Sequence, residues 1–330
     1  MICNFQLSLS NREGKSKVIN SVEGLLKRLI REGQLFKYDD EPLIGWYQKI
    51  RSDSGGCVPP DLEALYSGFF SNSVGQAFVS AYELALQRLT GVDTHKNVAA
   101  FCVTENKSTH PASMQSSLLL DDKGLYLLSG KKDFVTLAGE AKRLFVAVTF
   151  GVSDTGRSII KLVEVDVTTP GVNIQLHPEL PFVSEVSHGV VSFDSVIIEP
   201  DNIFSGDGYA DYVKPFRWLE DVNVFMSVSA YLFKLALAFD WSIEAKVEMM
   251  SLLTTLSGLH KMKVDDSIAH IVMFDQTVVL DKWLERYDTE WNKVPENILV
   301  HWKRDLVLLK IATRARKARY NNAVTALALL

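Results

Sequence analysis

The sequence predicts an α+β protein in which an N-terminal helical domain and a C-terminal helical bundle flank a central β-barrel or β-sandwich domain. Apolar residues recur at helical spacing in the first part of the chain. From about Val98 the chain changes to short β-rich runs separated by turn residues, and after Gly206 long helical patterns return. We therefore expect three segments, at 1–94, 95–205 and 206–330.

The N-terminal segment contains three recognisable helices. From Lys17 the apolar residues fall on one helical face, and Gly33 follows as a stop. Asp61 is typical of a residue that caps a short helix, and a longer helical pattern runs from about Val74 to Gly91.

The middle segment has seven strand-like runs. Turn chemistry separates them at 121–124, 153–156 and 168–171. This spacing predicts a compact barrel or sandwich. The runs are AAFCV, SSLLL, GLYLLSG, RLFVAVTF, SIIKLVEVD, GVNIQL and HGVVSFDSVII.

The C-terminal segment predicts long helices at 216–250, 264–288 and 297–328. The stretch 222–241 is long and apolar enough to cross a membrane. Lys234 lies inside it, so we expect the central helix of a bundle and no membrane span.

Composition excludes several classes of function. A net charge of −5 and a pI near 5.8 give no positive field for nucleic acid. Cys3, Cys57 and Cys102 form no CxxC pair and the seven histidines lack ligand spacing, so no metal site is predicted. The N-terminus has no secretory signal pattern, and we expect a cytoplasmic protein.

Two motifs carry the chemistry. One is Phe101-Cys102-Val103-Thr104-Glu105, and the other is Gly130-Lys131-Lys132-Asp133-Phe134-Val135-Thr136. They resemble two motifs of the acyl-CoA dehydrogenase family, an aromatic-x-x-Thr-Glu-Pro strand end and a later Gly-x-Lys-x-Trp-Ile-Thr strand. In that family these strands wrap a flavin ring.

Further matches follow in the same order. Residues 156–172 resemble the stretch that ends in the family's Pro-Gly-Val, and 191–202 resemble its following strand and exit. The resemblance covers residues 98–240, whereas the two ends of the chain agree only in being helical.

The resemblance implies FAD as cofactor. Phe101 and Phe134 would flank the flavin ring, Val103 and Thr104 would bond its pyrimidine edge, and Thr136 would lie near N5. A flat ring with polar edges suits apolar contacts and a few hydroxyl groups. The alternative is ordinary strand architecture, since Phe, Val and Thr are favoured in any sheet.

The sequence departs from the family in two places. Residues 106–111 replace a glycine turn whose serine helps to hold the cofactor phosphates in the family, and Ser108 or Thr109 is the possible substitute. The family's late Gly-Gly and Glu-Gly-Thr motifs are also missing.

α,β-Dehydrogenation needs a carboxylate to take an α-proton. Some branches of the family place it early in the helix after the β-domain, which here puts Asp221 at that position with Glu220 beside it. The alternative is that both carboxylates complement the helix dipole.

The expected function is therefore FAD-dependent dehydrogenation of an acyl-CoA or acyl-carrier thioester, with electrons passing to an electron-accepting flavoprotein. The alternative is a non-catalytic relative that serves subunit assembly. The basic residues of 297–328 indicate a solvated face or, alternatively, contacts to CoA or FAD phosphates.

The C-terminal helices also predict self-association. Residues 222–241 are apolar on more than one face, and Trp283, Trp291 and Trp302 add large aromatic surfaces. We expect these surfaces to be covered in a homo-oligomer, a dimer or a tetramer.

Overall fold

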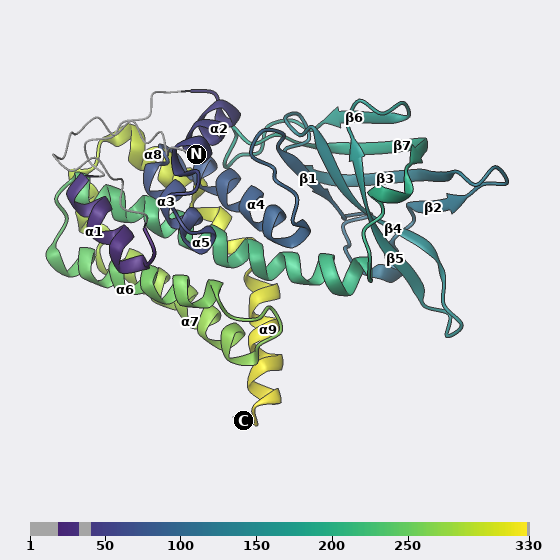
Figure 1. Cartoon of the computed structure of the whole chain (residues 1–330). Helices are drawn as coiled ribbons and strands as arrows, with labels where there is room; N and C mark the ends of the chain where they lie inside the picture. The colour runs from purple at the N-terminus through teal and green to yellow at the C-terminus, as the bar shows by residue number, and fades with distance from the viewer. Residues whose placement is uncertain (1–18, 33–40, 329–330) are drawn as a thin grey trace. The chain divides into compact units, whose positions relative to one another are not determined.

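The computed structural model describes residues 19–32 and 41–328. The chain divides into two compact units, here called the helical unit and the β unit (Figure 1). The helical unit comprises Met1–Leu84 and Leu219–Leu330, and the β unit comprises Ala85–Trp218. The helices before and after the strands thus belong to one unit, and the predicted α+β class is confirmed. Lys17 and Cys3 lie outside the described residues.

The described helices follow the predicted pattern, with α2 as an addition and with breaks in two long segments. Their bounds are α1 Val22–Glu32, α2 Leu43–Ser54, α3 Glu63–Phe70, α4 Val74–Thr90, α5 Lys214–Ala238, α6 Ile243–His260, α7 Ser267–Arg286, α8 Glu296–Asp305 and α9 Thr313–Ala326.

The prediction of one helix over 216–250 is wrong. Asp240 has a left-handed φ of 46° and ends α5, and the Ser242 hydroxyl then caps α6 by accepting a bond from Ala245 N. The predicted helix 297–328 is likewise divided, because the 3₁₀ turn Leu306–Lys310 separates α8 from α9.

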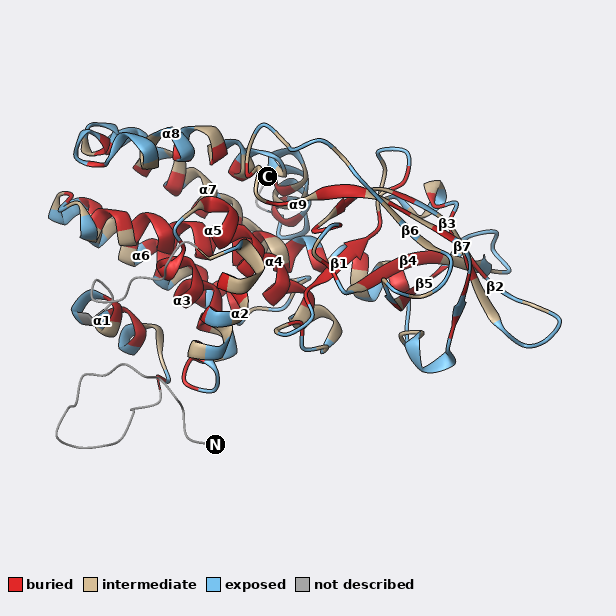
Figure 2. Ribbon diagram, turned by 90° about the horizontal axis from the view of Figure 1, so that it is seen from above, coloured by how far each residue is buried: buried red, intermediate tan, exposed pale blue. Residues whose placement is uncertain are grey.

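Helix α5 is the centre of the helical unit, and its ribbon is buried over most of its length (Figure 2). In the described residues one helical stretch, 208–238, is long and apolar enough to cross a membrane, and 83% of its most apolar window is buried. α3 packs closely on it, since a Cβ at Gly68 would lie 2.1 Å from the Ser227 carbonyl oxygen. Burial on this scale is typical of a core helix.

Four tryptophans pack together inside the C-terminal helices. Trp241 stacks on Trp283 at 5.4 Å between ring centroids and meets Trp291 edge-on at 5.1 Å, and Trp291 stacks on Trp302 at 5.4 Å. All four are buried. The expectation that Trp283, Trp291 and Trp302 present surface for a second chain is therefore wrong, because they cover one another.

The β unit contains the seven strands that the sequence predicts, joined in one curled mixed sheet. The order is β1-β4-β2-β3-β7-β6, with β5 paired to β4. β1 and β2 run parallel to β4, and the other pairs are antiparallel. The strands are β1 Ala99–Cys102, β2 Ser117–Leu120, β3 Tyr126–Thr136, β4 Arg143–Val152, β5 Ser158–Asp166, β6 Val172–Leu176 and β7 His188–Ile198.

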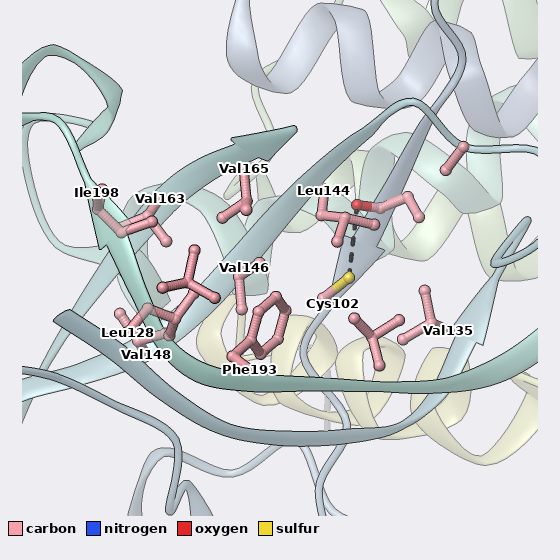
Figure 3. Packing of buried hydrophobic residues seen from close by; sticks show 14 of the residues in the cluster. Cys102, Leu128, Val135, Leu144, Val146, Val148, Val163, Val165, Phe193 and Ile198 are labelled. Atoms are coloured by element: carbon pink, nitrogen blue, oxygen red, sulfur yellow. Dashed lines mark hydrogen bonds between the residues drawn. The ribbon is translucent and has the colours of Figure 1, made fainter. Parts of the chain in front are cut away.

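An apolar cluster fills the inside of this curled sheet (Figure 3). Alternate residues of β4, namely Leu144, Val146 and Val148, point into it together with Phe193 of β7. Cys102 lies in the same cluster, where burial raises the pKa of its thiol to about 12, so it stays protonated.

Gly130 bends β3 at the start of the second motif. Its φ is 138°, and a Cβ there would lie 2.4 Å from the Ser116 hydroxyl. The register between β3 and β7 shifts at this point. A second register shift, between Lys132 and Val135, changes which side chains point inward, because Lys132 and Val135 are both buried although their positions differ by an odd number of residues.

Candidate functional site

The two sequence motifs meet where β1 ends beside β3. The Asp133 amide donates a 2.9 Å hydrogen bond to the Thr104 carbonyl, and the Asp133 carboxylate accepts a 2.6 Å bond from Asn106 N. These bonds bring the residue before Phe134 next to Thr104. The structure therefore joins the segments that the resemblance selects.

A buried ion pair fastens this junction. Lys132 Nζ donates 2.5 Å hydrogen bonds to Glu105 Oε1 and to the Ala147 carbonyl, and both charged side chains are buried. Glu105 also accepts bonds from the amides of Gln115 and Ser116. Fully bonded charges of this kind hold a loop in one geometry.

The pair affects both pKa values. Burial opposes ionisation of Glu105, but Lys132 and the amide donors outweigh it and hold the carboxyl pKa below its usual value. Burial is the main cause that lowers the pKa of Lys132, and Glu105 opposes it. The pair was not predicted from the sequence, although Glu105 closely follows the apolar strand β1 and Lys132 lies within β3, so both ionisable residues adjoin the buried part of the sheet.

Phe134 and Thr136 lie on one face of β3, opposite Val135. Val135 is in the apolar cluster, whereas Phe134 is 45% exposed. No other aromatic side chain in residues 19–32 and 41–328 is as open to solvent. Within the same described ranges, the hydroxyls of Thr104 and Thr136 make no side-chain hydrogen bond. This face of β3 thus offers an open ring and the Thr136 hydroxyl, while Thr104 lies at the adjoining end of β1, where its carbonyl meets Asp133.

Two histidine rings contact Phe134, and no spacing in the sequence identifies them. The His177 ring lies 6.0 Å from the Phe134 ring at an interplanar angle of 27°, and the His188 ring lies 4.6 Å away at 33°. His188 is also the register partner of Thr136. Burial is the main cause that lowers the pKa of His188, and His177 adds to it.

The other residues predicted to contact the flavin are buried or already hydrogen-bonded. Phe101 is buried, and its ring lies 4.5 Å from that of Phe216. Val103 is buried, while Ser108 is half-buried and its hydroxyl accepts a bond from His110 N. Of the predicted residues, Phe134 and Thr136 share one face of β3, and the Thr104 backbone adjoins them through its bond to Asp133.

The candidate base Asp221 belongs to the helical unit and is held by two guanidinium groups. Arg316 donates to Oδ1 at 2.8 Å, and Arg319 donates to Oδ2. Arg316 also lies 4.9 Å from the centre of the Phe225 ring and donates to the Leu309 carbonyl. Glu220 is half-buried beside this cluster.

No group of three metal-ligating side chains occurs among the residues that the structure describes. The site chemistry rests on aromatic rings, hydroxyls and ion pairs.

Comparisons with known proteins place this fold. No family model matches the sequence, and no curated protein matches it. A solved FAD-dependent dehydrogenase matches with a TM-score of 0.68 and 13% identity, covering 94% of this chain and 98% of that one.

Two further structures agree. Butyryl-CoA dehydrogenase from Megasphaera elsdenii matches with a TM-score of 0.60 and 16% identity over 91% of this chain and 93% of that one. PigA with FAD and proline matches with a TM-score of 0.63 and 13% identity over 98% and 99%. The protein is therefore built on the fold of FAD-dependent dehydrogenases. More particularly, it has the acyl-CoA dehydrogenase fold, as its strand motifs predicted.

Proposed function

We propose that the protein is an FAD-dependent oxidoreductase that dehydrogenates an acyl thioester between its α and β carbons. The observation that carries this proposal is the exposed Phe134 ring, with Thr136 on the same face of β3 and Thr104 at the adjoining end of β1. An exposed ring near hydroxyl groups that make no side-chain hydrogen bond fits a flat apolar group with polar edges. The residues present thus fit a flavin.

In this proposal each residue has a simple role. Phe134 packs against the ring, and the hydroxyls of Thr104 and Thr136 hydrogen-bond its edges. The Lys132–Glu105 pair fixes the junction that positions Thr104. When bound, the flavin supplies the acceptor for the β-hydride.

The α-proton goes to a carboxylate, for which the candidates are Glu220 and Asp221. We favour Glu220, because both oxygens of Asp221 already accept bonds from arginines. A substrate would have to displace one of these guanidinium groups to reach an Asp221 oxygen.

The proposed substrate is a thioester of CoA or of a carrier protein. The likeness to butyryl-CoA dehydrogenase supports a thioester, and a thioester also acidifies the α-proton that the base must remove. The electrons then pass to an electron-accepting flavoprotein.

Anaerobic titration with acyl-CoA tests this function. Thioester should reduce the bound flavin, Glu220→Gln should slow that reduction by about 100-fold or more, and Asp221→Asn should leave the rate near wild type if the fold holds. Equal rates in wild type and Glu220→Gln would remove Glu220 from the mechanism. No reduction by any thioester would contradict the proposed reaction.

A second candidate is a non-catalytic relative with a structural role. The two ion pairs of Asp221 favour this structural role, because they hold α9 against α5. A protein that binds no flavin but still assembles would support this candidate.

We also propose that the chain forms a homo-oligomer. Apolar side chains stay exposed on the C-terminal helices, at Ile243 and Val247 of α6, Ile268 of α7 and Val300 of α8. Light scattering at micromolar protein should give at least twice the chain mass of 37.0 kDa. A clean monomer would overturn this part of the proposal.

A further inference from the structure

Three rings meet at the exposed Phe134, which is stacked with His177 and in tilted contact with the buried His188. Phe134 comes from β3, His177 follows β6 directly, and His188 begins β7. The two imidazoles are tilted from the Phe134 ring by 27° and 33°. We call these residues the three-ring stack.

The backbone fixes both imidazoles in place. His177 Nε2 donates to the Asp133 carbonyl at 2.9 Å, and His188 Nδ1 donates to the Val186 carbonyl at 3.0 Å. A carbonyl can only accept, so these bonds also set which nitrogen carries the proton. The orientation of each ring is therefore set before any ligand arrives.

The exposure of the Phe134 ring is not explained by the packing of the β unit. Phe134 keeps 45% of its surface in water, although the apolar cluster lies on the opposite side of the same strand. Oriented rings beside an exposed aromatic side chain are a suitable surface for a planar ligand, since aromatic rings prefer offset parallel or edge contacts.

We propose that the isoalloxazine ring of the cofactor extends the three-ring stack, so that His177 and His188 are positioning residues for it. This inference rests on the proposed function, because the ligand is the flavin invoked there. Thr136, the register partner of His188, then lies at the same ring. The neutral His188 adds a hydrogen-bond acceptor at Nε2 and no charge.

Nuclear magnetic resonance of the imidazole protons tests the contact directly. The full chain, freed of any bound flavin, is titrated with riboflavin, which carries the ring without phosphate, and separately with ADP. Riboflavin should move the His177 and His188 resonances, because a flat ring shifts nuclei that lie over its face. ADP should leave them in place. His177→Gln and His188→Gln assign the two signals.

Affinity provides a second measurement. His177→Ala should weaken riboflavin and FAD binding roughly tenfold, whereas His177→Phe, which keeps a ring, should bind close to wild type. Leu120→Ala is the matched control, since Leu120 is 59% exposed on β2 of the same sheet and lies outside the stack.

The outcomes separate the two claims. If FAD binds but neither imidazole signal moves and His177→Ala binds normally, the stack is wrong and the proposed cofactor stands. If ADP moves the imidazole signals instead, an adenine occupies the stack and the inference is overturned. If no flavin binds the wild-type chain, the proposed function fails and this inference fails with it.

Discussion

Arg316 donates a 2.8 Å hydrogen bond to the carboxylate of Asp221, and both side chains are buried. Asp221 lies near the start of α5 and Arg316 lies on α9, so the pair fastens the last described helix to the core helix. Arg319 supplies a second cation to the same carboxylate. The position that the sequence offered as a catalytic base thus has a structural role in this chain.

Arg316→Met should therefore destabilise the fold. It leaves the buried carboxylate with one partner, and breaking a buried pair from one side costs about 3–5 kcal/mol. Arg314→Met, at an exposed position of the same helix, should change the free energy of unfolding by less than about 0.5 kcal/mol. Urea unfolding of both variants is the measurement, and equal stabilities would show that the buried pair contributes nothing.

Because Lys132 forms a buried ion pair with Glu105, its substitution should destabilise the fold more than substitution of its neighbour Lys131. Lys132→Met leaves Glu105 buried without its cation and should cost about 3–5 kcal/mol, whereas the exposed Lys131→Met should cost under about 1 kcal/mol. The double variant Lys132→Met/Glu105→Gln should recover part of the loss. A double variant less stable than Lys132→Met alone would contradict the pairing.

Lys234 predicts a pH dependence on the alkaline side. Burial lowers its pKa from 10.5 to about 8, and its ammonium group donates to the Ser71 carbonyl at the end of α3. The unfolded chain binds this proton more tightly than the folded chain, so stability should rise between pH 8 and pH 10.5. By linkage the rise is at most about 3 kcal/mol.

Comparison with Lys234→Met isolates this effect, since all other titrations are shared. The stability of wild type relative to the variant should increase from pH 8 to pH 10.5 and stay level below pH 8. A difference that is constant over the whole range would show that Lys234 titrates normally.

Substitution by alanine should have opposite effects on stability at Gly68 and at Gly258. A Cβ at Gly68 would lie 2.1 Å from the Ser227 carbonyl oxygen, so Gly68→Ala should force α3 from α5 and cost about 1–3 kcal/mol. Nothing lies within 4 Å of a Cβ at Gly258 in α6, so Gly258→Ala should stabilise by about 0.5–1 kcal/mol. Thermal unfolding of the two variants should shift in opposite directions.

Local sequence patterns were sufficient to predict the strands of the β unit. All seven strands follow the predicted runs, because alternation and turn residues act over a few positions. The break between α5 and α6 escaped prediction because an aspartate, Asp240, takes the left-handed conformation that usually indicates glycine.

Contacts between residues far apart in the sequence could not be predicted from local patterns. The Lys132–Glu105 bond joins residues 27 positions apart, and the contact of His177 with the Asp133 carbonyl spans 44. The burial of Trp283 and Trp302 depends on which helices meet, which their apolar patterns do not specify. Thr104, Phe134 and Thr136 could be proposed as site residues from the sequence because two local motifs contain them.

Equilibrium titration with FAD, followed by absorbance and fluorescence, measures whether Phe134, Thr136 and the adjoining Thr104 bind a flavin. Wild type should bind FAD and perturb its visible spectrum. Phe134→Ala should weaken binding roughly tenfold, and Thr136→Val should weaken it or alter the flavin reduction potential while the fold stays intact. Failure of wild type to bind FAD, or wild-type affinity and potential in both variants, would show that these residues do not hold a flavin.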